Sequence, residues 1–230
     1  MIIAIDGPSG AGKSTLGKML ANKFNLLYLD TGAMYRAVAL AVLESGTNFE
    51  DKVKVAEIAE NSKIELLGEP ENLQVVLNGK DVSASIRTYE VGQAASIVST
   101  ISEVRRVLVD HQRTIGEKSV NGAVLDGRDI GTVVFPKADI KFFLTAKPEA
   151  RARRRFEEDL QKDRAVSYEH TFAEITERDE RDVSREDSPL SIAEDAVVID
   201  TSELDLSEVF DRMTEEISKL NRVNAKESIR

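Results

Sequence analysis

The amino-acid sequence predicts an α/β fold in which helices cover both faces of a doubly wound, five-stranded parallel sheet. Three observations lead to this prediction. Five short apolar runs have the length and composition of buried strands, helical patterns lie between most of them, and a glycine-rich turn joins the first run to the first helix. A chain of 230 residues can bury the core of one compact α/β domain with insertions.

The expected strands are continuous apolar runs, which is typical of parallel strands buried on both faces of a sheet. They cover residues 2–6, 26–30, 123–126, 140–144 and 197–200. Helical periodicity follows the first two runs and gathers apolar side chains on one face of each helix: Leu16, Met19, Leu20 and Phe24 in residues 13–24, then Met34, Val38, Ala41 and Val42. Ligands of such sheets bind at the carboxyl ends of the strands.

Residues 63–83 interrupt this alternation and predict a small antiparallel insertion. Residues 64–66 and 73–77 have a strand-like composition, and Asn78-Gly79 is a two-residue hairpin signal. Helical patterns then cover residues 89–98 and 102–115. A closing helix is expected over about 206–220, followed by a polar tail that should fray.

The composition restricts the function classes. No apolar run reaches the ~18 residues of a membrane helix, and Asp6 interrupts the only early apolar stretch, so we expect a cytoplasmic protein without a secretory signal. The net charge of −10 opposes general binding to nucleic acids or anionic membranes. With no cysteines and only His111 and His170, any metal should be bound by oxygen atoms and arrive with a nucleotide. No long exposed apolar face stands out, so we expect a monomer.

Residues 7–15 lie between the first predicted strand and the first helix and have the pattern of a phosphate-binding loop. Gly7, Gly12, Lys13 and Ser14 fit the spacing G-x-x-x-x-G-K-[ST], in which glycines let backbone N–H groups encircle a polyphosphate. Lys13 would reach the β and γ phosphates, Ser14 would offer its hydroxyl to Mg²⁺, and the helix N-terminus would face the same anion. The pattern predicts a fold of the P-loop NTPase type. We expect ATP contacts along the whole loop: Gly7, Pro8, Ser9, Gly10, Ala11, Gly12, Lys13, Ser14 and Thr15.

Two other interpretations of this loop fit less well. A glycine-rich turn in an ordinary strand-to-helix connection would not need the Lys-Ser pair after the last glycine. A dinucleotide fold would place a ribose-binding acid where Asp30 lies, but Thr15 stands where its fingerprint requires glycine or alanine. The sequence therefore disfavours NAD binding.

A second cluster follows the second predicted strand. Residues 30–36 read Asp-Thr-Gly-Ala-Met-Tyr-Arg and place an acid, a hydroxyl, a tyrosine and an arginine where another ligand would face the loop. A structural interpretation is also open, in which Thr31 caps the helix and Arg36 lies on a solvated face.

A third cluster, Asp126-Gly127-Arg128-Asp129, follows the third predicted strand. Asp126 has the position of a Walker-B-like acid and would orient water around Mg²⁺. Arg128 and Asp129 would then project into the cleft. The alternative is an Asp-Gly turn with a local ion pair.

Residues 151–185 carry eight arginines and ten acids. This composition fits either a solvated helical surface or a mobile flap that bears arginines, and charge counting favours the surface. Helical spacing brings Arg181 beside Arg185, where like charges repel. The two therefore need an anionic partner elsewhere; on the structural interpretation, which this segment alone favours, local acids such as Asp182 and Asp187 supply it.

Together these motifs resemble those of the bacterial cytidylate kinases, the CMP and dCMP kinases among the P-loop nucleoside monophosphate kinases. The resemblance covers almost the whole chain and rests on residues 5–15, 29–36, 126–136 and 177–182, whose combination is far more specific than the loop alone. It implies ATP- and Mg²⁺-dependent phosphorylation of CMP and dCMP. The insertion near residues 63–83 resembles the extra acceptor-side element of the bacterial enzymes.

The resemblance also implies a division of the single domain and a set of site residues. The core would comprise about residues 1–60, 102–150 and 186–220, with an acceptor-binding insertion of about 61–101 and a helical lid of about 151–185. Cytosine would be read by Ser96, Arg105 and Asp129, with Thr31 close by. The acceptor phosphate would be held by Arg36, Arg128 and Arg185, and the sugar approached by Arg178 and Asp182. Arg151 and Arg154 are candidate lid contacts to ATP. Catalysis would rest on Lys13, Asp126, Arg128, Arg178 and Arg185.

Two other functions stay open on the residues alone. A P-loop kinase of another acceptor would take UMP or a small hydroxyl metabolite. A hydroxyl acceptor needs a carboxylate to take its proton, and Asp30 could fill that role. A regulatory GTP switch normally carries an Asn-Lys-x-Asp guanine motif, whereas residues 22–25 read Asn-Lys-Phe-Asn inside the first helix. The density of arginines favours a phosphate-bearing acceptor.

Overall fold

A computed structural model describes residues 1–161 and 166–227 of the chain. Its central sheet has five parallel strands in the order β2-β6-β1-β7-β8. The strands are β1 (Ile2–Asp6), β2 (Leu27–Asp30), β6 (Ala123–Gly127), β7 (Ile140–Thr145) and β8 (Val197–Asp200). The five runs expected from the sequence are therefore the five strands, and β1, which leads into the glycine-rich loop, lies at the centre.

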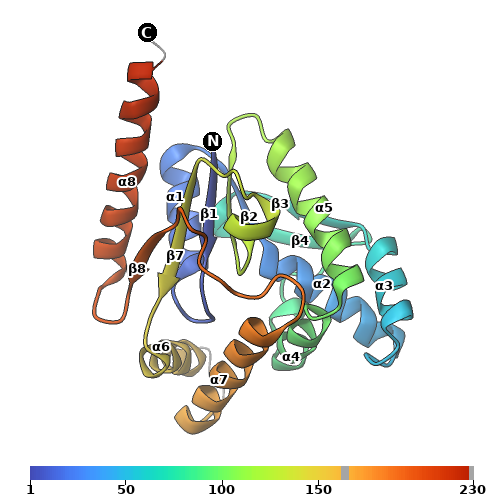
Figure 1. The fold of residues 1–230 in the computed structure, drawn as a ribbon. Coiled ribbons are helices and arrows are strands. Elements are labelled where there is room, and N and C mark those ends of the chain that lie inside the picture. The colour runs from blue at the N-terminus through green and yellow to red at the C-terminus, as the bar shows by residue number, and fades with distance from the viewer. Residues whose placement is uncertain (162–165, 228–230) are drawn as a thin grey trace.

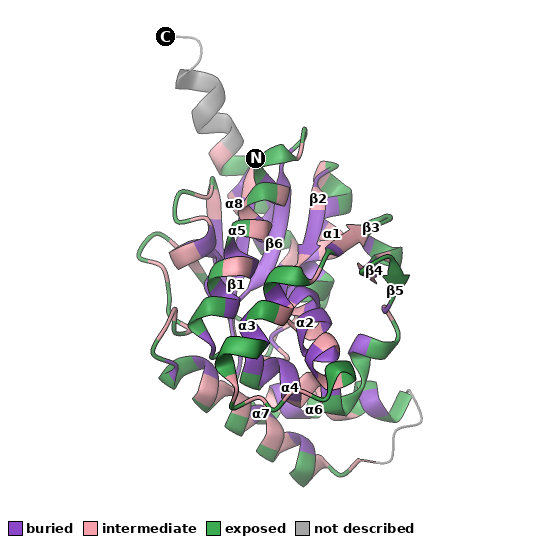
Figure 2. Cartoon of the chain, turned by 90° about the vertical axis from the view of Figure 1, so that its right-hand side faces the viewer, coloured by how far each residue is buried: buried purple, intermediate pink, exposed green. Residues whose placement is uncertain are grey.

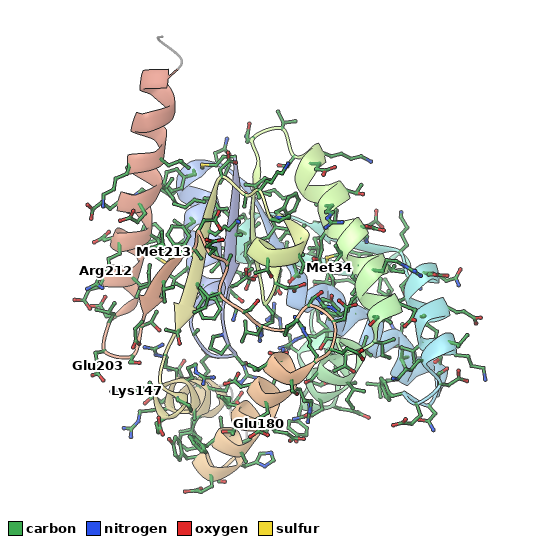
Figure 3. All side chains as sticks on the ribbon, in the orientation of Figure 1. Met34, Lys147, Glu180, Glu203, Arg212 and Met213 are labelled. Carbon is green, nitrogen blue, oxygen red and sulfur yellow. The ribbon has the colours of Figure 1, made fainter. Side chains whose placement is uncertain are left out.

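Helices cover both faces of this sheet (Figure 1). α1 (Lys13–Phe24) and α8 (Leu206–Glu227) pack on one face, and α2 (Thr31–Ser45) and α5 (Ser102–Lys118) belong to the core on the other. Figure 3 shows Met213 of α8 and Met34 of α2 on opposite sides of the sheet. The central strands β1 and β6 between them are buried, as Figure 2 shows, so the doubly wound fold predicted from the apolar runs is confirmed.

The insertion is a three-stranded antiparallel sheet of β3 (Ile64–Leu67), β4 (Gln74–Leu77) and β5 (Lys80–Asp81). Asn78 and Gly79 form the hairpin between β4 and β5, with φ of 51° and 82°. This left-handed pair is the reason that Asn-Gly signals a tight hairpin. α3 (Lys52–Asn61) precedes the sheet, and α4 (Tyr89–Val98) follows it and packs against α2.

Two further helices, α6 (Pro148–Gln161) and α7 (Tyr168–Ser184), pack against each other beyond the carboxyl ends of the strands (Figure 1). α7 also contacts α4, so the segment expected as a lid meets the insertion. Lys162 and Arg164 of that segment lie outside the described residues. A short π-helix (Ile130–Val134) links β6 to β7.

The C-terminal helix is longer than the sequence predicted. α8 continues to Glu227, whereas a frayed tail was expected after about residue 220. Residues 221–227 contain neither glycine nor proline, so nothing in their sequence terminates the helix. Among residues 1–161 and 166–227, no helix combines the length and hydropathy needed to cross a membrane.

Candidate active site

The glycine-rich loop turns sharply between β1 and α1. Gly7 has a φ of 146°, and a Cβ at this position would lie 2.0 Å from the carbonyl oxygen of Leu144 on β7. Gly12 has a φ of 89° and caps the N-terminus of α1. Because a side chain would clash at the first position and strain the second, the glycines of the phosphate-loop spacing are required by the geometry itself.

Lys13 lies buried at the start of α1, and its Nζ donates to the carbonyl oxygen of Pro8 at 2.6 Å. Burial holds the pKa of this ammonium well below its usual range, and the neighbouring Arg128 lowers it further. The loop therefore encloses a cation that an anionic ligand would stabilise.

Asp126 is the second-last residue of β6 and lies beside this helix. Its Oδ2 accepts from Ser14 Oγ at 2.6 Å and its Oδ1 accepts from Tyr28 Oη at 3.1 Å. Burial, together with the charge of Asp30, raises the pKa of Asp126 to about 6. A hydroxyl and a carboxylate side by side are the hard oxygen ligands that Mg²⁺ prefers, so the Ser14–Asp126 pair fits the Mg²⁺ site predicted from the motif. Tyr28 was not predicted; its only signal is a hydroxyl inside an otherwise apolar strand.

Asp129 lies at the centre of a buried ion pair. Arg105 Nη2, from α5, is 2.5 Å from its Oδ2, and Arg185 Nη2 is 3.6 Å from its Oδ1. Arg105 is 2% exposed, and its guanidinium lies 5.6 Å from the centre of the Tyr35 ring. Three residues predicted to face the acceptor thus meet although they are far apart in the sequence.

Ser96 and Thr31 complete this part of the site. Ser96, on α4, is buried, and its Oγ accepts from Arg181 Nη1 at 2.8 Å. Thr31 Oγ1 donates to the carbonyl oxygen of Asp126 at 2.7 Å, which holds the start of α2 against β6. The cap of α2 is Asp30, whose Oδ1 accepts from the Ala33 amide at 2.9 Å, so the interpretation of Thr31 as the cap is wrong.

An arginine cluster lies beside these groups. Arg128 Nε is 2.6 Å from Oδ2 of Asp182. Burial lowers the pKa of Arg178 to about 9, with Arg128 as the next cause, and burial and nearby arginines also lower the pKa of Arg36. Within the described part of the chain, the Nε of Arg178 is buried without a hydrogen-bond partner. The cluster therefore holds more positive charge than its carboxylates neutralise.

Several local pairings expected from the sequence are replaced by long-range ones. Arg128 and Asp129 do not form the local pair of an Asp-Gly turn, because their partners are Asp182 and Arg105. Arg185, the residue directly after α7, pairs with Asp129 rather than with Asp182 or Asp187.

The two candidate lid arginines lie at different places. Arg151 is buried, and its Nη1 is 3.0 Å from the carbonyl oxygen of Ser9 in the loop and 2.6 Å from Oδ2 of Asp179 on α7. Arg154 instead donates from Nη1 to Thr201 Oγ1 at 3.0 Å, beside the end of β8. The structure thus brings Arg151 to the loop and leaves Arg154 bound to a different strand end.

Asp6 is a further buried group that the sequence did not single out, although an acid directly before Gly7 was visible. Its two carboxylate oxygens accept from the amides of Ile130 and Gly131, at 2.8 and 2.7 Å. Burial raises the pKa of Asp6 to about 6. In the described residues, no group of three or more histidine, aspartate or glutamate side chains forms a separate metal site.

The parallel sheet, the phosphate loop with its strand-end carboxylate and the facing arginines define a P-loop kinase. A family model described as cytidylate kinase matches residues 3–219. The cytidylate kinase of Carboxydothermus hydrogenoformans is 48% identical over 97% of this chain and 100% of its own length, and that of Bacillus subtilis is 46% identical over 96% and 97%. The chain belongs to the cytidylate kinase family.

A solved structure supports the fold independently of sequence. An uncharacterized protein from Eubacterium ventriosum matches with a TM-score of 0.52 over 95% of this chain and 98% of its own, at 14% identity. At that identity the likeness concerns the fold alone.

Proposed function

We propose that this chain transfers the γ-phosphoryl group of ATP to CMP and dCMP, giving ADP and CDP or dCDP. The observation that carries the proposal is the excess positive charge around Arg178, whose depressed pKa and unpartnered Nε favour an anionic acceptor beside the phosphate loop. Membership of the cytidylate kinase family over residues 3–219 supports the identity of that acceptor.

ATP would bind along residues 7–15, with loop amides and the N-terminus of α1 facing its phosphates. Lys13 would exchange its bond to Pro8 for the β and γ phosphates. Ser14, and Asp126 through water, would hold Mg²⁺, which neutralises charge on the donor phosphates when bound. Arg151 is the better supported lid contact, because it already reaches Ser9; Arg154 would have to leave Thr201.

The acceptor would lie between α4, α5 and the arginine cluster. Ser96, Arg105 and Asp129 would read cytosine, with Thr31 close by. Asp129 would accept from the exocyclic amine, which uracil lacks. The phosphate would be held by Arg36, Arg128 and Arg185, and the sugar approached by Arg178 and Asp182.

The chemistry needs no general base, because a phosphate oxygen of CMP is already ionised near neutral pH and attacks the γ-phosphorus in line. The obstacle is repulsion between two polyanions. Permanently charged guanidinium groups counter it with paired hydrogen bonds, each contributing roughly 1.5–3 kcal/mol. Arg128, Arg178 and Arg185 would supply these guanidinium groups and Lys13 an ammonium charge, and closure of α6 and α7 over the site would exclude water.

The wider organisation follows from these roles. We assign acceptor binding to about residues 61–101 and the lid to about 151–185, with the remaining sheet and helices as core. We expect a monomer working in the cytoplasm. The alternatives, a hydroxyl-acceptor kinase and a GTP switch, are not retained, since the family match is to cytidylate kinases and the Asp30 carboxylate is engaged as a helix cap.

The test is ADP formation from ATP and Mg²⁺ with CMP, dCMP, UMP, AMP, GMP and shikimate as separate acceptors. We expect turnover with CMP and dCMP far above that with the other four. Equal rates of ADP formation with CMP and UMP would contradict the proposed cytosine recognition. If no nucleotide acceptor gave ADP, the acceptor assignment would be wrong, while the assignment of the phosphate loop would stand.

A further inference from the structure

Asp6 joins the end of β1, directly before the phosphate loop, to the segment that follows Asp129. It is the last residue of β1, directly before Gly7, and it is 4% exposed. Its carboxylate reaches to the segment after β6 and accepts from the amides of Ile130 and Gly131, at 2.8 and 2.7 Å. Those two amides directly follow Asp129.

We propose that Asp6 is a positioning residue that fixes Asp129 relative to the phosphate loop and thereby sets the discrimination between CMP and UMP. This inference rests on the proposed function, and in particular on the role of Asp129 in reading cytosine.

The geometry makes Asp6 a rigid reference point. β1 is the central strand, and Asp6 is paired with Gly127 of β6 on one side and Phe143 of β7 on the other. The backbone of Asp129 has φ −142° and ψ 24°, outside helix and strand, so the strand does not fix it. The two bonds that Asp6 accepts therefore hold the Asp129–Ile130 peptide and the peptide after it, while Arg105 and Arg185 hold the side chain of Asp129.

Gly131 donates one of the two amide hydrogen bonds that Asp6 accepts. A Cβ there would lie 3.3 Å from Oδ2 of Asp6 and 3.0 Å from Cδ of Lys141. Its backbone does not have a positive φ, so alanine at this position would disturb the contact with Asp6 without straining the backbone.

The test is the ratio of kcat/KM for CMP to that for UMP, measured alongside KM for ATP, in Asp6→Asn and Gly131→Ala. Asparagine keeps one acceptor and turns an N–H toward the other amide, so one of the two bonds is lost. We expect the ratio to fall by about fivefold or more, since small misplacement of a contacting group strongly affects selection, with KM for ATP within about twofold of wild type.

Asp139→Asn is the matched control. Oδ2 of Asp139 accepts from the Ile2 amide at 2.6 Å, at the opposite end of the same strand. This variant also removes a carboxylate that accepts from a backbone amide, but far from the loop, so its CMP-to-UMP ratio should equal that of wild type.

Suppose that wild type prefers CMP over UMP and that folded Asp6→Asn and Gly131→Ala keep the same CMP-to-UMP ratio of kcat/KM. That result would leave the proposed function standing and overturn the positioning role. A matching rise of KM for ATP and for CMP would also overturn it, because Asp6 would then support the loop in general. Absence of CMP phosphorylation by wild type is the distinct result that removes the proposed function and this inference together.

Discussion

Nη1 of Arg181 lies 2.8 Å from the hydroxyl oxygen of Ser96, so a side chain of α7 donates to the residue of α4 that is proposed to contact cytosine. A second bond, from Gln93 Nε2 to Glu174 Oε1 at 2.7 Å, joins the same two helices. A hydroxyl that accepts from an arginine has its own proton free for another acceptor, and cytosine presents two, O2 and N3. With CMP bound as proposed, Arg181 would therefore orient Ser96 as a donor toward the base.

We expect Arg181→Met to raise KM for CMP about threefold with little change in KM for ATP, because the hydroxyl loses a charged donor that polarises it. In steady-state kinetics, Arg181→Met should raise KM for CMP when it is introduced into wild type, but not when it is introduced into Ser96→Ala. Gln93→Leu is the control, since it removes the other bond between α4 and α7 and leaves Ser96 untouched. The same loss in the Ser96→Ala background would contradict this role.

Arg128→Ala should lower turnover with CMP by roughly tenfold or more, as expected for a lost charge-assisted contact to the acceptor phosphate. The change also leaves Asp182 without the guanidinium 2.6 Å from it. Initial rates at saturating ATP would measure the effect. Arg212→Ala is a suitable control, because it also removes an arginine side chain but lies exposed on α8, which packs on the sheet face away from α2 and α5. Near-normal kinetics of Arg128→Ala would remove its assigned role.

Asp129→Asn should narrow the preference for CMP over UMP and lower stability at the same time. The amide presents a donor to the base, and it leaves Arg105, which is 2% exposed, without its carboxylate partner. Removing one member of a buried pair typically destabilises by about 3–5 kcal/mol. Acceptor competition and chemical denaturation measure the two effects separately. A large stability loss with an unchanged CMP-to-UMP ratio would move base recognition to other residues.

Arg178→Met should raise the stability of the protein, whereas Asp129→Asn lowers it, and it should abolish most of the activity. Burial and Arg128 lower the pKa of Arg178 to about 9, so the fold without bound phosphate carries this charge unfavourably. Replacing it with an apolar chain of similar length should raise the free energy of unfolding by roughly 1 kcal/mol. Denaturation without nucleotides is the measurement, and a destabilised variant would show that Arg178 is already neutralised by Asp182.

The pH dependence of stability should report on Asp6 and Asp126. Burial raises the pKa of each carboxyl to about 6 from 3.8, so both bind protons more tightly when folded. Proton binding to these two carboxyls contributes to the free energy of unfolding. This contribution is full below 3.8, the pKa in the unfolded chain, and is lost as the pH rises through the folded pKa of about 6. From pH 5 to pH 7, the nucleotide- and Mg²⁺-free protein should lose about 1 kcal/mol for each group. Denaturation at pH 5, 6 and 7 should show a shallower slope for Asp6→Asn than for wild type.

The sequence predicts most of this fold because its strands are continuous apolar runs and its loop has fixed glycine spacing. It also identifies Asp126, Arg128 and Asp129 as residues at a strand end that faces ligands. It does not predict their partners, since the pairs of Arg128 with Asp182 and of Arg105 with Asp129 join segments far apart in the chain. Asp6 was missed for the same reason: its role exists only when the end of β1 lies beside Ile130.

The stretch from Asp126 to Asp129 contacts three separate segments with four consecutive residues. Asp126 contacts Ser14 at the phosphate loop, while Arg128 and Asp129 contact Asp182 on α7 and Arg105 on α5. An inserted or deleted residue would turn these side chains toward the wrong partners, because a shift by one residue reverses the faces of an extended chain. In this stretch the count of residues is therefore constrained as strictly as their identity.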